Sequence, residues 1–71
     1  MIKVADAKTI GERLVKLRGD RTKRTVQAET GLGYSAICMY ENGYRIPNDQ
    51  AKAILSAYYA TSIEELFYTK E

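Results

Sequence analysis

Two glycines separated by a single residue, Gly31-Leu32-Gly33, interrupt the middle of the chain and constrain its fold more than any other feature. Gly31 is suited to the left-handed conformation that closes a helix, and Gly33 is a tolerable N-cap for a following helix. Val26 and Thr30, four residues apart, lie on the inward face of the helix that precedes this turn. The segment therefore predicts two short helices joined by a turn of about three or four residues that contains glycine.

Capping and turn signals define three more short helices in the chain. A capping box begins with a hydroxyl residue and has Glu three positions later, and we expect such boxes to open the first and the fifth helix. The expected boundaries are a first helix from the Thr9–Glu12 box to Gly19-Asp20, a second from Thr22 to Gly31, a third over residues 34–41 that ends at Asn42-Gly43, a fourth after Asn48, and a fifth from the Ser62–Glu65 box to about Tyr68. Because no segment alternates with period two over strand length, we expect a compact all-α domain of five helices.

The length and composition favour one small domain without a metal or disulfide framework. Its 71 residues predict a single domain over 1–71, with a core over 9–68, and 45% hydrophobic residues suffice for one compact core. Histidine is absent, and the lone Cys38 fits a reducing, cytoplasmic setting. No run reaches the length of a membrane span, and the N-terminus carries too many charges for a signal peptide. We expect no metal, no cofactor, no membrane contact and no small-molecule ligand.

The charges are unevenly distributed along the chain. Residues 1–47 carry nine Lys or Arg and five Asp or Glu, a net charge of +4, whereas residues 48–71 carry two and four, a net charge of −2. A basic first part beside an acidic tail is typical of a protein with one polyanion-binding face, although chance can also produce this distribution.

Residues 30–40 contain no charged side chain, although charged residues make up 28% of the chain. On a helical wheel of residues 34–41, Ile37 and Tyr40 form one face, whereas Tyr34, Ser35 and Met39 lie elsewhere. A helix exposed only to water usually carries Lys or Glu on its outer face. Three interpretations remain open: a fully buried helix, a protein-binding helix, and a helix that docks in the DNA major groove, where hydroxyl and apolar groups contact base edges.

Over most of its length, the chain resembles a known family. Its segments IGERLVKLR, TKRTVQAETGLGYSAICMYENG, RIP and AYYATSIEELF, in this order and spacing between Ile10 and Tyr68, resemble the Cro/C1-type helix-turn-helix domain of the lambda-repressor-like, or XRE, family. The resemblance implies a five-helix fold with the helix-turn-helix at the second and third helices. It also implies a sequence-specific transcriptional regulator, typically a repressor, that binds a double-stranded DNA operator as a homodimer.

The resemblance assigns a role to each of eleven positions. The base-reading positions of the third helix are Tyr34, Ser35, Ala36 and Met39. The phosphate-contacting positions are Thr22, Lys23, Asn42, Gly43 and Arg45. Arg18 and Glu41 occupy a pair that forms a salt bridge in many members of the family.

Some positions depart from the family pattern. Gly33 replaces the usual Ser or Thr cap. Ala60 stands where Gly usually closes the fourth helix, so a left-handed residue there would carry strain.

Two other classes of function compete with DNA binding. An enzyme is disfavoured because the chain has no histidine, no phosphate-binding glycine loop and no nucleophile–base pair. The serious alternative is an antitoxin-like or partner-binding module that acts through protein contacts. It would use a residual patch of the C-terminal aromatic residues Tyr58, Tyr59, Phe67 and Tyr68.

Overall fold

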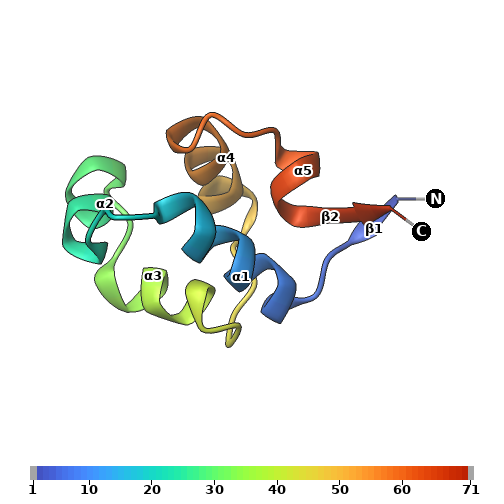
Figure 1. Ribbon diagram of the computed structural model, residues 1–71, viewed down its shortest axis with the longest axis horizontal. Coiled ribbons are helices and arrows are strands. Elements are labelled where there is room, and N and C mark those ends of the chain that lie inside the picture. The colour runs from blue at the N-terminus through green and yellow to red at the C-terminus, as the bar shows by residue number, and fades with distance from the viewer. Residues whose placement is uncertain (1, 71) are drawn as a thin grey trace.

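Five helices form the body of the protein, and a short sheet closes one end. The computed structural model describes residues 2–70. The elements are β1 Ile2–Val4, α1 Ala7–Arg18, α2 Lys23–Thr30, α3 Tyr34–Glu41, α4 Asp49–Tyr58, α5 Ile63–Phe67 and β2 Tyr68–Lys70. The body measures 36 × 22 × 22 Å, with the β1–β2 sheet at one end of the long axis and α2 at the other (Figure 1). The expectation of a mostly helical protein is thus confirmed.

The first helix begins earlier than its predicted capping box. Asp6 is the N-cap, and its side-chain oxygen accepts a hydrogen bond from the Thr9 N–H at 2.7 Å. This hydrogen bond, given by the Thr9 backbone, lowers the pKa of the Asp6 carboxyl below 3.8. The assignment of Thr9 as the cap was therefore wrong, because Asp6 caps the helix one turn earlier and Thr9 lies within α1, where it donates its own N–H to Asp6.

The β1–β2 sheet was not predicted. The two strands are antiparallel, with Lys3 opposite Thr69 and Val4 opposite Tyr68. The Ala5 N–H then donates to the Phe67 carbonyl at 2.9 Å, and the Ala5 side chain is buried, so the core begins before residue 9. The strands were missed because three residues are too few to show an alternation with period two. Tyr68, which was expected near the end of the fifth helix, is the first residue of β2.

The predicted turn between α2 and α3 is confirmed. Thr22 caps α2 by accepting the Thr25 N–H, and Gly31 closes it in the left-handed conformation with a φ of 79°. Gly33 begins α3 as an extended N-cap without a side-chain hydrogen bond. At the far end of α3, the expected stop at Asn42-Gly43 is present: Asn42 is right-handed with a φ of −84°, and Gly43 has a positive φ of 77°.

The later helices begin where capping predicts. Asn48 accepts the Ala51 N–H at 2.8 Å, and Ser62 accepts the Glu65 N–H at 3.0 Å. Ala60, just past α4, has a φ of 52°, which confirms the expected strained position. The Arg13 guanidinium donates to the carbonyls of Glu65, Leu66 and Tyr68 at 3.1, 3.3 and 2.8 Å, and so fastens α1 to the end of α5 and the start of β2.

The core lies between α1, α3, α4 and α5. Gly11 marks the closest crossing of α1 and α3, because a Cβ there would lie 2.5 Å from the Glu41 carbonyl oxygen. The main cluster of buried side chains comprises Ala5, Ile10, Leu14, Tyr40, Ala51, Leu55, Leu66 and Phe67. Val26 and Ile37 are also buried, which anchors α2 and α3 to the same body.

Candidate nucleic-acid interface

Helix α3 has one buried face and one exposed face. Ile37 and Tyr40 point into the core, as the helical wheel predicted. Ser35, Met39 and Asn42 are exposed on the opposite side, at spacings of four and three residues that place them above one another along the helix. We call these three residues the exposed stripe. It carries no charge, and because Met39 is 40% exposed, the side chain is a surface group rather than part of the core.

Tyr34 lies at the margin of the exposed stripe rather than on it. Its side chain is 40% exposed, and the Arg24 guanidinium lies 5.3 Å from the centre of its ring. This cation–π contact joins the first turn of α2 to the first turn of α3.

Ala36 contributes least to the exposed face among the four predicted base-reading residues. It is half-buried and packs against the main core cluster. Ala36 lies four residues before the buried Tyr40, on the same side of the helix, which explains why its side chain points toward the core.

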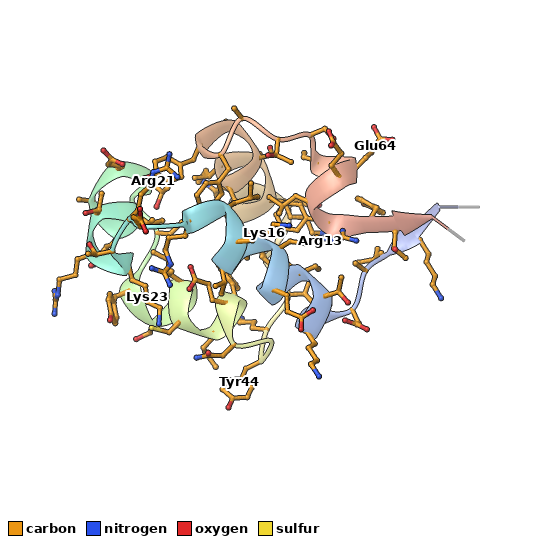
Figure 2. All side chains as sticks on the ribbon, in the orientation of Figure 1. Arg13, Lys16, Arg21, Lys23, Tyr44 and Glu64 are labelled. Carbon is orange, nitrogen blue, oxygen red and sulfur yellow. The ribbon has the colours of Figure 1, made fainter. Side chains whose placement is uncertain are left out.

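The start of α2 presents positive charge beside α3. Thr22 shares its hydroxyl between the Thr25 N–H at 3.1 Å and the Thr25 hydroxyl at 3.0 Å, so its oxygen already serves as the helix cap. Lys23 is half-buried, Arg24 is exposed, and no acidic residue occupies the first turn of α2. The positive end of the helix dipole and the two side chains together favour an anion at this end of the molecule. Figure 2 shows Lys23 at the N-terminal end of α2, on the side toward α3.

The loop after α3 is held close to α1 and projects two side chains. Gly43 lies so near α1 that an added Cβ would meet the Lys8 Cα at 3.0 Å. Arg45 is exposed, and Tyr44 is 77% exposed and extends away from the body below α3 (Figure 2). Tyr44 was not among the predicted site residues. Its place between Gly43 and Arg45 was the available signal, but no sequence pattern revealed its exposure.

The predicted ion pair between Arg18 and Glu41 is present. Arg18 Nε donates to Glu41 Oε2 at 2.8 Å, and Arg18 also donates to the Arg21 carbonyl at 2.7 Å. The hydrogen bond to Glu41 raises the pKa of the Arg18 guanidinium above its usual value. The pair ties the end of α3 to the end of α1, and so fixes the orientation of the exposed stripe.

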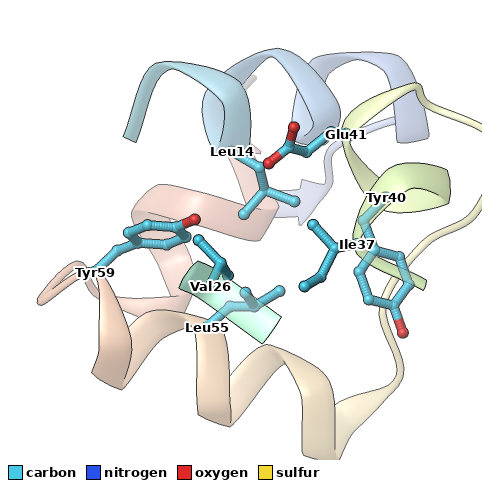
Figure 3. Close-up of a pocket in the computed structure, with 7 residues that line it drawn as sticks. All are labelled: Leu14, Val26, Ile37, Tyr40, Glu41, Leu55 and Tyr59. Atoms are coloured by element: carbon cyan, nitrogen blue, oxygen red, sulfur yellow. The ribbon is translucent and has the colours of Figure 1, made fainter. Parts of the chain in front are cut away.

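The second oxygen of the Glu41 carboxylate faces the protein interior. The Glu41 side chain is only 4% exposed, and its Oε1 has no hydrogen-bond partner among the described residues. It borders a cavity of about 10 Å³ that is otherwise lined mainly by apolar side chains and by Tyr59 (Figure 3). Burial raises the pKa of the Tyr59 hydroxyl to about 12, and the neighbouring Glu41 carboxylate adds to this effect.

The C-terminal aromatic residues do not form the exposed patch that a partner surface would need. Phe67 is buried, and Tyr58, Tyr59 and Tyr68 are half-buried. The Arg21 guanidinium lies 5.4 Å from the centre of the Tyr58 ring and 5.7 Å from that of Tyr59. The Tyr58 hydroxyl also donates to the Glu29 carboxylate, which raises the Tyr58 pKa. These side chains are thus engaged within the protein.

Comparison with known proteins finds no matching family model, no matching curated protein and no matching solved structure. Within residues 2–70, no helix has the length and apolar character needed to cross a membrane. The same residues contain no group of three or more potential ligands placed to hold a metal ion.

Proposed function

We propose that the protein is a sequence-specific DNA-binding transcriptional regulator with a lambda-repressor-like fold. In this proposal α2 and α3 form a helix-turn-helix, and α3 enters the major groove with the exposed stripe toward the base edges. The observation that carries the proposal is the uncharged stripe on the solvent side of α3, since a surface helix without a ligand usually carries charged residues there.

The charges around the stripe support a polyanionic ligand. Lys23 and Arg24 lie at the start of α2, and Arg45 lies in the loop beyond the end of α3. Basic residues on both sides of an uncharged helix face suit contacts to the phosphates that border a groove. An acidic side chain on the stripe would repel the phosphates, and the stripe has none.

A homodimer on a two-fold symmetric operator follows from the same proposal. Two copies of α3 would lie about 34 Å apart, which is one turn of DNA. Cys38, a free cysteine that is half-buried, suits the reducing cytoplasm in which such a regulator would act. Sedimentation with a full operator would measure the stoichiometry, and one bound copy per complete site would contradict the dimer.

The test begins with selection of binding sites from random double-stranded DNA. The affinity for the selected site and for an unrelated duplex is then measured by fluorescence anisotropy at several salt concentrations. We expect a preferred sequence and a steep loss of affinity with salt. Lys23→Ala and Arg45→Ala should each weaken both duplexes alike and reduce the slope of log K against log salt by about one.

A matched control is Lys16→Ala. Lys16 is an exposed lysine of α1 that lies beside residues of α5, away from α3, so its removal changes the net charge equally. Its salt slope should equal that of the unmodified protein. If Lys16→Ala lowered the slope as much as Lys23→Ala, net charge and not a phosphate contact would explain the effect.

The second candidate is an antitoxin-like or partner-binding module. The exposed Tyr44 and Ile46 favour it, because they add apolar surface in the loop that follows α3, where the Tyr44 N–H donates to the Met39 carbonyl at 2.9 Å. The engaged C-terminal aromatic residues weigh against it. Absence of binding to any duplex at low salt would reject the DNA proposal in favour of this one.

A further inference from the structure

The exposed stripe is unusual in the chemistry that it offers to a base edge. Guanine is most often recognised by Arg or Lys, and adenine by Asn or Gln, through paired hydrogen bonds. The stripe has no Arg, Lys or Gln, and its one amide, Asn42, occupies the C-cap at the end of α3. The middle of the stripe therefore offers one hydroxyl, from Ser35, and one flexible apolar side chain, from Met39.

Only one group in the major groove matches an apolar side chain. The C5-methyl of thymine is the sole apolar feature that a base pair displays there. We propose that Met39 recognises a thymine methyl, so that each half-site of the bound DNA contains a thymine that this side chain contacts. This inference rests on the proposed function and names the base that the same site reads.

The structure of α3 allows Met39 to approach the base closely. Ser35, one turn earlier on the same face, is small, and Gly31 and Gly33 add no side chain in front of the helix N-terminus. Tyr34 is the only large side chain in the first turn, and its contact with Arg24 keeps it at the margin. The three rotatable bonds of methionine let its thioether fit against a methyl group without a fixed geometry.

Replacement of thymine by uracil tests the inference, because uracil pairs in the same way and lacks only the methyl group. Each thymine of the selected site is replaced in turn, and Kd is measured for the unmodified protein, Met39→Ala and Met39→Leu. We expect one thymine per half-site at which uracil weakens binding by roughly fourfold, the loss of one buried methyl. Met39→Leu should keep this sensitivity, and Met39→Ala should lose it.

Ser35→Ala serves as the matched control, since it truncates the neighbouring residue of the same stripe. It should preserve the uracil sensitivity even if it changes overall affinity. The inference is overturned if uracil is neutral at every position with the unmodified protein, or if Met39→Ala retains the full sensitivity. Either result leaves the proposed function intact, whereas failure to bind any duplex at low salt rejects the proposed function itself.

Discussion

Gly11→Ala gives a stability prediction in which two known effects have opposite signs. Gly11 lies within α1, where alanine is intrinsically favoured over glycine by about 1 kcal/mol. At this position, however, the new Cβ would lie 2.5 Å from the Glu41 carbonyl oxygen and 2.8 Å from that of Tyr40. Ordinary contact begins at 3.4 Å, so α1 and α3 would have to separate locally by up to 0.9 Å, the difference between 3.4 and 2.5.

The contacted atoms cannot move cheaply, because both are backbone atoms of the last turn of α3. The Tyr40 carbonyl accepts the Gly43 N–H at 3.3 Å, and the Glu41 side chain is fixed by its ion pair with Arg18. Overpacking of a core costs about 1–3 kcal/mol, and a backbone clash belongs at the upper end of this range. After subtraction of the helix propensity, we expect Gly11→Ala to lower the free energy of unfolding by about 2 kcal/mol. The melting temperature of a domain of this size would then fall by roughly 10 °C.

Urea unfolding followed by circular dichroism measures this change. Ala53→Gly is the reference, because Ala53 is exposed within α4 and reports helix propensity without a clash. It should cost about 1 kcal/mol, which establishes that this protein prefers alanine in an open helix. If Gly11→Ala proved as stable as the unmodified protein or more stable, the close crossing of α1 and α3 would be refuted.

Three further predictions concern the supports of the fold. Arg18→Ala should lower the free energy of unfolding by about 3 kcal/mol, because it leaves the buried Glu41 charge unpaired, and the double variant Arg18→Met/Glu41→Leu should recover most of this loss in urea unfolding. Ala60→Gly should raise the stability by about 0.5–1 kcal/mol, since glycine removes the cost of the positive φ, and an unchanged thermal midpoint would contradict the strain. Burial raises the pKa of Tyr59 to about 12 in the folded protein, against 10.0 for the free group. The folded state therefore holds the Tyr59 proton more tightly than the unfolded state, and the resulting contribution to the free energy of unfolding is complete below pH 10 and is lost as the pH rises toward 12. Urea midpoints across this range should fall for the unmodified protein and fall less for Tyr59→Phe.

Helix boundaries were predicted well where the signal is local. The caps Thr22, Asn48 and Ser62 and the closing Gly31 each act through hydrogen bonds or φ angles within a few residues, so the sequence alone contains the relevant partners. The exception is α1, where Asp6 and Thr9 both satisfied the local rule and Asp6 formed the cap.

Features that depend on distant residues were missed or left open. The pairing of β1 with β2 joins the two ends of the chain, and neither three-residue strand has a pattern of its own. The exposure of Met39 and the partial burial of Tyr58 and Tyr59 beside Arg21 could not be read from the helical wheel, because they depend on which helices pack above each face.

The sequence by itself therefore determined the helices and the turn at Gly31–Gly33, since capping and backbone conformation are settled within a few residues. The charge-free segment also pointed to the outer face of α3 as a place for a ligand. Only the tertiary structure decided which side chains remain on that face. Burial is a property of the whole packed body, and the crossing at Gly11 and the Arg18–Glu41 pair set the orientation of α3 within it.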